Sequence, residues 1–147
     1  MQFVDLVLNP FLGIMAVAYA ALAVRVARTS PQYATSSVSF FLALIAGMLA
    51  GSAFSYNADS AGLYSIGRTL SYSAAGFLPL VFYTIYREYT VGPPRVLYVV
   101  ILAVIPMLSM GIALTNSMHN ILWIVNETPT GIVYSEMTSH PYYSRVY

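Results

Sequence analysis

Long apolar runs, separated by short polar segments, dominate most of the chain. Four of these runs have roughly the 20 residues that an α-helix needs to cross the hydrocarbon core of a bilayer. They cover about residues 6–24, 36–56, 63–86 and 96–116. None of them alternates between apolar and polar positions as a membrane β-strand does, and a backbone in lipid must satisfy its own hydrogen bonds. The pattern therefore predicts an all-α integral membrane bundle of four transmembrane helices.

Turn-forming residues separate the runs. Ser30-Pro31 follows the first run, residues 57–62 follow the second, and Gly92-Pro93-Pro94 follows the third. Proline and glycine in such clusters favour turns over the continuation of a helix. We therefore expect three short connections between four consecutive helices.

The segment 117–147 differs from the four runs. It mixes apolar and polar residues and contains two prolines and one glycine, so it is too broken to span a membrane. We expect an amphipathic tail of short helices or loops on the outer face, with residues 121–124 dipping into the interface. The chain then divides into a four-helix transmembrane region, residues 1–116, and an extracytoplasmic tail.

The composition agrees with lipid as the main solvent. Hydrophobic residues make up 59% of the 147 residues and charged residues 7%, whereas soluble domains carry about 25% charged residues. A soluble protein this apolar could not cover its surface with polar groups. The net charge of +1 favours no nucleic acid partner. The chain has no cysteine, which excludes disulfides, thiolate catalysis and cysteinyl metal sites.

The arginines predict the orientation of the bundle. Arg25 and Arg28 follow the first run, and Arg87 and Arg95 flank the connection after the third. Membrane loops rich in Lys or Arg stay on the cytoplasmic side. We therefore expect these two loops inside the cell, and the N-terminus and the tail outside.

Two features inside the runs bear on helix packing. Ala43, Gly47, Gly51 and Ser55 place a small residue at every fourth position, on one face of the second helix. Small residues let helix backbones approach closely in lipid. The face therefore packs either against a neighbouring helix of the same chain, the simpler reading, or against a second copy in a homodimer. Pro79 is expected to kink the third helix.

Arg68 is the charge that lies well inside an apolar run, and such charges are costly and often functional. One reading is structural, because its long side chain can reach the headgroups or meet Asp59. The other reading is functional. Arg68 and Tyr72 stand one helical turn apart, so they could line a cavity open to the outside that receives an anionic or polar signal.

A second candidate cluster lies at the outer end of the fourth run. It consists of Thr115, Asn116, His119 and Trp123. The spacing puts the last three on one helical face. They either form a polar cap, since helix ends need hydrogen-bond partners, or a site that binds a ligand or senses pH, since histidine titrates near neutrality.

Other chemistry finds little support in the sequence. There is no phosphate-binding glycine loop, no paired carboxylates and no lysine for a Schiff base. The two histidines are His119 and His140, and the second stands in the tail beside Pro141. Two histidines placed in this way do not predict a metal or haem site. We expect no catalytic residues, no metal and no cofactor.

Several of these landmarks resemble the N-terminal seven-transmembrane sensor region of bacterial histidine kinases. The likeness lies in Arg25-Val26-Ala27-Arg28, in residues 77–88, and in residues 114–123 followed by Gly131 and Tyr142-Tyr143. In that family a Thr-Asn pair, a histidine and a nearby tryptophan mark the outer end of the fourth helix. The resemblance extends over nearly the whole chain but covers about the first four of the seven helices.

The resemblance implies a membrane-embedded sensor that passes an extracytoplasmic or membrane signal to a cytoplasmic output module, in the bacterial inner membrane. It also implies that the partners are the lipid bilayer and other transmembrane helices, which could be further helices of the same protein, a homodimer partner or a larger complex. The alternative is a small non-catalytic structural subunit of a respiratory or photosynthetic membrane complex. The gene sequence after Tyr147 would separate the two hypotheses.

Overall fold

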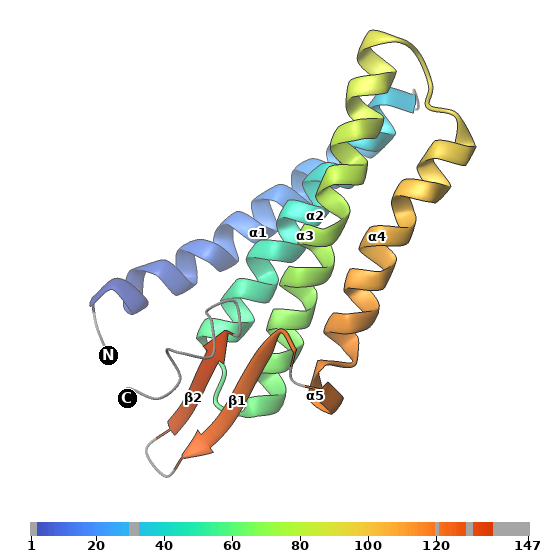
Figure 1. The fold of residues 1–147 in the computed structure, drawn as a ribbon. Coiled ribbons are helices and arrows are strands. Elements are labelled where there is room, and N and C mark those ends of the chain that lie inside the picture. Colours follow the sequence, from blue (N-terminus) through green and yellow to red (C-terminus); the bar gives the residue numbers. More distant parts are fainter. Residues whose placement is uncertain (1–2, 30–32, 120, 129–130, 137–147) are drawn as a thin grey trace.

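A computed structural model describes residues 3–29, 33–119, 121–128 and 131–136 (Figure 1). Helices fill the apolar runs, which confirms the predicted all-α membrane class. The elements are α1 (Phe3–Thr29), α2 (Tyr33–Tyr56), α3 (Ala61–Thr90), α4 (Val96–Leu114), the single turn α5 (Asn116–His119), β1 (Trp123–Thr128) and β2 (Gly131–Glu136).

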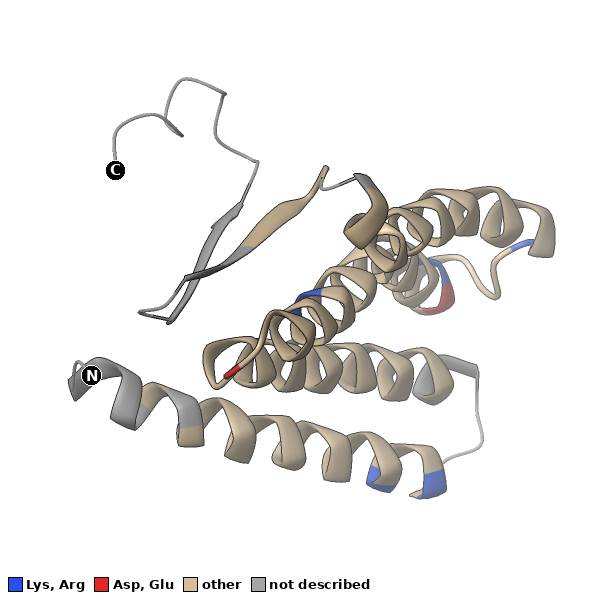
Figure 2. Ribbon diagram, turned by 90° about the horizontal axis from the view of Figure 1, so that it is seen from below, with Lys and Arg blue, Asp and Glu red and all other residues tan. Residues whose placement is uncertain are grey.

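The four long helices form an open row. Extensive contacts join α1 to α2, α2 to α3, and α3 to α4. The turn between α2 and α3 lies at the same end of the row as the hairpin of β1 and β2, and we call this the hairpin end (Figure 1). The opposite end, where α1 and α3 finish, carries Arg25, Arg28, Arg87 and Arg95 and is called the arginine end. Most of the charged positions lie near helix ends (Figure 2).

Within the described residues, three helices are long and apolar enough to cross a membrane. They are Pro10–Thr29 within α1, Ser36–Tyr56 within α2, and Val96–Leu114, which is α4. The fourth predicted span lies in α3, which is the longest helix at 30 residues but is less apolar than the other three. Its position in the row, between two apolar helices, is the structural argument for a fourth crossing.

The α2–α3 pair is held together by a close approach of two backbones. A Cβ atom on Gly51 would lie 2.5 Å from the carbonyl oxygen of Gly67. A Cβ atom on Gly67 would lie 2.6 Å from the carbonyl oxygen of Gly51 and 2.5 Å from the Ser55 hydroxyl. Only glycine leaves room for this contact, because real Cβ atoms do not approach other atoms so closely.

Hydroxyl groups at the same crossing find partners within the two helices. Ser71 Oγ donates to the carbonyl oxygen of Met48 at 3.1 Å and lies 3.4 Å from Ser52 Oγ. Ser55 Oγ donates to the carbonyl oxygen of Gly51 at 3.0 Å. Since lipid offers no hydrogen bonds, these local partners let polar side chains lie between the helices.

The small-residue face predicted on α2 packs mainly within the chain. Gly51 and Ser55 meet α3 as described above, and a Cβ atom on Gly47 would lie 3.6 Å from Cβ of Ala74. Ala43, the remaining member of the face, is exposed. In this structure α3 therefore covers three of the four positions.

The limits of α3 follow from local chemistry. Ser60 caps its first turn, since its Oγ accepts the backbone N–H of Leu63 at 3.3 Å. At the other end the N–H groups of Val91 and Gly92 donate to the carbonyl oxygen of Arg87, and Gly92 has a φ of 111°, which favours glycine. The helix continues through Pro79, whose side chain is exposed.

The tail contains an antiparallel β-hairpin, so the prediction of short helices or loops is wrong for this part. Trp123 pairs with Glu136, and Thr128 pairs with Gly131. The first three residues of β1 are aromatic or β-branched, a composition that favours strands. The prediction from residues 121–124 alone did not include the pairing of Trp123–Thr128 with Gly131–Glu136.

The glycine crossing predicts a large difference between two Gly→Ala substitutions in α3. In Gly67→Ala the new methyl group collides with α2, and overpacking of this kind costs about 1–3 kcal/mol. In Gly76→Ala the new methyl group lies 3.5 Å from Cβ of Ser109, an ordinary contact. The purified chain in detergent should therefore unfold at a lower temperature, or at a lower denaturant concentration, in Gly67→Ala only.

The second control is Gly13→Ala in α1, where nothing lies within 4 Å of the added methyl group. Alanine is the better helix former, so this variant should be as stable as the parent or slightly more stable. Equal stability of all three variants would contradict the close α2–α3 contact.

Candidate functional site

An aromatic cluster at the hairpin end contains the most completely buried side chains described in the chain. Tyr64 of α3 and Trp123 of β1 are each 1% exposed, and Ala113 of α4 is 2% exposed. Trp123 stacks on Tyr72, with 5.3 Å between ring centroids and 29° between the planes. We call Tyr64, Tyr72, Ala113 and Trp123 the aromatic cluster; it joins the hairpin to two of the long helices.

Asn116 fixes the chain between α4 and β1. It is 2% exposed. Its Nδ2 donates to the carbonyl oxygen of Trp123 and its Oδ1 accepts the backbone N–H of Leu122, each at 2.8 Å. The amide thus satisfies one backbone group just before β1 and one on its first residue. This is a structural role, close to the polar cap that was one of the two readings of this segment.

Arg68 lies against Tyr64 on the same face of α3. Its Nε donates to the Tyr64 hydroxyl at 2.9 Å, and its Cζ lies 5.4 Å from the centroid of the Tyr64 ring. The side chain is half-buried. The guanidinium group is therefore held by a hydrogen bond and a cation–π contact to the aromatic cluster.

A cavity of about 340 Å³ opens beside the aromatic cluster, and we call it the hairpin-end cavity. Residues from α3, α4, α5 and β1 line it: Ser65, Ile66, Thr69, Ala113, Leu114, Asn116, Ser117 and Trp123. Thr69 Oγ1 donates to the carbonyl oxygen of Ala113 across the α3–α4 interface, at the long distance of 3.4 Å. Arg68 and Tyr72 are not part of this lining.

The structure brings part of the predicted site together. Tyr72, Asn116 and Trp123 meet around the cavity and the aromatic cluster. Thr115 is exposed, and its hydroxyl donates back to the carbonyl oxygen of Gly111 at 2.8 Å. The side chain of His119 lies outside the described residues.

One detail of the predicted site is wrong. Asn116 and Trp123 do not share a helical face, because the helix ends at His119 and Trp123 begins a strand. Trp123 is instead buried against α3. The cause is the hairpin, which turns Trp123 back onto α3.

Tyr64, Ser65 and Thr69 were missed as members of the site. The spacing of Tyr64, Arg68 and Tyr72 at i, i+4 and i+8 could have revealed an aromatic stripe on α3. No comparable signal marks Ser65 and Thr69, because serine and threonine are common in membrane helices. Their place in the cavity follows from the packing of α3 on α4.

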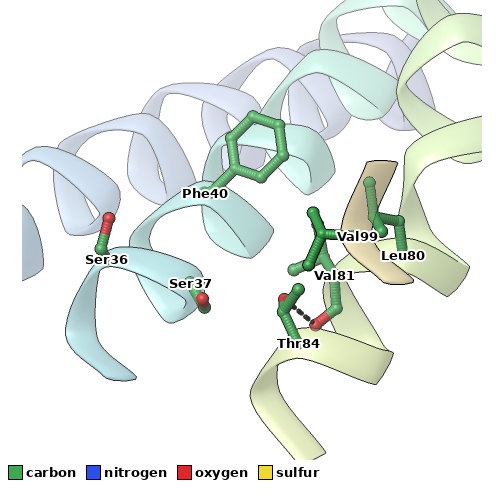
Figure 3. A pocket seen from close by; sticks show the side chains of 7 residues that line it. All are labelled: Ser36, Ser37, Phe40, Leu80, Val81, Thr84 and Val99. Atoms are coloured by element: carbon green, nitrogen blue, oxygen red, sulfur yellow. Dashed lines mark hydrogen bonds between the residues drawn. The ribbon is translucent and has the colours of Figure 1, made fainter. Parts of the chain in front are cut away.

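A second cavity, of about 240 Å³, lies toward the arginine end (Figure 3). It is lined by α2, α3 and α4 through Ser36, Ser37, Phe40, Leu80, Val81, Thr84 and Val99. Ser37 Oγ donates to Oε1 of Glu88 at 2.9 Å and so ties α2 to α3. In the described part of the chain, the other carboxylate oxygen of Glu88 and Nε of Arg87 are enclosed without a hydrogen-bond partner.

Among the described residues, no three His, Asp or Glu side chains come together in a cluster that could hold a metal ion. His140 lies outside that part of the chain. The described site is therefore one of aromatic, hydroxyl and amide groups.

Long apolar helices define the chain as a multi-helix membrane protein. A family model described as the N-terminal 7TM region of histidine kinase matches residues 10–147. The chain belongs to this family, which confirms the resemblance seen in the sequence. No curated protein matches the chain, and no solved structure matches it. The family makes this chain a sensor region in a lipid environment.

The two hydrogen bonds of Asn116 predict the effect of its removal. Asn116→Ala removes the side-chain partner of the Leu122 N–H and of the Trp123 carbonyl oxygen, and a buried polar group left unsatisfied costs about 1–3 kcal/mol. The hairpin should loosen, and Trp123 should become exposed. Trp123 is the only tryptophan in the chain, so its emission should shift to longer wavelength.

The control is Ser117→Ala, the neighbouring residue, whose side chain is exposed. Its emission should match that of the parent. An unchanged emission maximum in Asn116→Ala would mean that the amide does not hold the hairpin in place.

Proposed function

We propose that this chain is the input region of a signalling protein, and that it passes an extracytoplasmic or membrane signal to a cytoplasmic histidine kinase or similar output module. The observation that carries the proposal is the family match over residues 10–147. The chemistry of the phosphoryl transfer would then belong to the output module, and this region would control it through the positions of its helices.

The proposed path through the membrane has four crossings, with the hairpin end outside. At 1.5 Å per residue, α3 is about 45 Å long, which exceeds the roughly 30 Å of hydrocarbon. Its Arg87 and Glu88 lie in the last turn, and Arg68 lies near the hairpin end, where a long side chain can approach the headgroups. Four arginines at the arginine end favour the cytoplasm for that end.

The aromatic cluster suggests how a signal at the outer end reaches the inner end. Trp123 contacts α3 through Tyr72, and Asn116 ties the same strand to the end of α4. A displacement of the hairpin would therefore act on two helices at once. At the other end of α3, Glu88 accepts the Ser37 hydroxyl of α2, so movement of α3 would also change the cytoplasmic contacts of α2.

The partners in this proposal are lipid, further transmembrane helices and the output module. The described helices form an open row, which leaves faces of α1 and α4 for additional helices of a seven-helix region or for a second copy. We place the protein in the inner membrane of a bacterium. No observation favours the alternative of a structural subunit in a respiratory or photosynthetic complex.

The proposed topology predicts the activity of a reporter. Alkaline phosphatase folds only outside the bacterial cytoplasm, so a fusion after Tyr147 should be active. A fusion at Gly92, in the connection between α3 and α4, should be inactive. The opposite pair of results would reverse the orientation, and two active fusions would mean that α4 does not return across the membrane.

The signalling proposal predicts that changes at the hairpin end alter output without altering expression. In the polypeptide that joins this region to its output module, Arg68→Ala removes a contact to Tyr64, and His119→Ala changes a residue of the predicted site. Basal autophosphorylation in isolated membranes should change about fivefold or more for each variant, the lower range of typical allosteric coupling.

Ile105→Ala serves as the control, because this side chain is 66% exposed on α4 and lines neither cavity. Its autophosphorylation should equal that of the parent at equal expression. Parent-like output in both hairpin-end variants would show that these residues are structural and that the signal does not pass through them.

A further inference from the structure

We propose that the hairpin-end cavity binds a small uncharged molecule that has an apolar body and one or two hydrogen-bonding groups. The inference rests on the proposed function in one respect only: the bound molecule would be the signal, or part of it. The site itself is argued from the size, charge and hydrogen-bonding groups of the cavity.

The size of the cavity limits its ligand. Ligand pockets in proteins have volumes of roughly 300–1,000 Å³, and the hairpin-end cavity, at about 340 Å³, lies near the lower limit. A single ring or a short chain with a polar group fits this space. A nucleotide, a sugar chain or a complete lipid would not.

The described lining offers an ion no partner of opposite charge. Among the described residues that line the cavity, none is charged. Arg68 is the nearest candidate in sequence, but its guanidinium group is engaged with Tyr64 and the residue is not part of the lining. An ion that entered the cavity would lose its hydration without gaining a partner of opposite charge. This differs from the anionic signal that Arg68 suggested in the sequence.

Hydroxyl groups supply the polar contacts. Ser65, Ser117 and Thr69 line the cavity and carry hydroxyls, and the bond from the Thr69 hydroxyl to the carbonyl oxygen of Ala113 is long, at 3.4 Å. The Asn116 amide is already used, because its two polar atoms bond to the backbone of Leu122 and Trp123. The apolar side of the ligand would lie against Leu114 and the ring of Trp123.

The position of Thr69 connects binding to movement of the helices. Its hydroxyl bridges α3 and α4 at the level of the cavity. A ligand that accepts a hydrogen bond from Thr69 would replace this weak bridge and separate the two helices. The α2–α3 contact at Gly51 and Gly67 has no such freedom. Binding would therefore displace α4 relative to a fixed α2–α3 pair.

The test uses three probes of nearly equal shape: benzyl alcohol, which is neutral, and benzoate and benzylammonium, which are ions at pH 7. The purified chain in lipid nanodiscs is titrated with each, and the emission of Trp123 is followed. Benzyl alcohol should give a saturable change with half-saturation in roughly the millimolar range, as expected for so small a ligand. The two ions should give none at the same concentrations.

Two variants distinguish binding in the cavity from general partitioning of the probe into lipid. Ser65→Phe fills the cavity from α3, and Ser117→Phe fills it from α5, where the side chain is exposed and folding is least at risk. Both should lose the saturable change. Ser36→Phe, at the second cavity, is the matched control and should retain it.

Tighter binding of benzoate or benzylammonium would overturn the proposal, as would a response that survives both filling variants or fails to saturate in the parent. These outcomes do not depend on the output module. A chain that binds benzyl alcohol while its output stays insensitive to Arg68→Ala and His119→Ala would contradict the proposed signal path and leave the binding site standing.

Discussion

Hydrocarbon offers no hydrogen-bond partner, and the structure depends on this constraint at every level. It forces the apolar runs into helices, because a helix pairs its own backbone groups. It also favours nearby partners for polar side chains between helices, as for Ser71, which donates to the carbonyl oxygen of Met48, and Ser39, which donates to that of Ala23. Where the backbone leaves the helix after α4, the amide of Asn116 supplies the partners that water would otherwise provide.

The same constraint makes helix association depend on fit rather than on hydrophobic burial, since lipid tails are as apolar as the side chains. The row shows two kinds of fit. At Gly51 and Gly67 two backbones touch, which leaves no room for even a methyl group. Between α3 and α4 the contacts are ordinary, as at Gly76 and Ser109, and a cavity remains at the hairpin end. A fixed pair of helices beside a looser third is a suitable arrangement for a sensor, because a ligand can only shift an equilibrium between states that the packing already allows.

Much of the fold could be read from the sequence, because run length and arginine placement are properties of single segments. The four helices and the small-residue face of α2 are of this kind. The hairpin and the burial of Trp123 could not be read in the same way, since they depend on the pairing of β1 with β2 and on contact with Tyr72. Only part of the candidate site could be predicted, because its other members come together through contacts between helices. Asn116 and Trp123 stood out as unusual residues near a helix end, whereas Ser65 and Thr69 gain their place only from the approach of α3 to α4.

The central claim is that α3 crosses the bilayer between two apolar helices in spite of its charges. The chain has no cysteine, so single spin labels can be placed at exposed positions of α3 without other changes. Ile66, Leu70, Phe82, Tyr86 and Tyr89 are such positions. Collision rates with oxygen and with a water-soluble nickel complex in nanodiscs measure the depth of each label. A crossing helix predicts shallow labels at Ile66 and Tyr89 and deep labels at Leu70 and Phe82, whereas the same shallow depth at all five positions would contradict it.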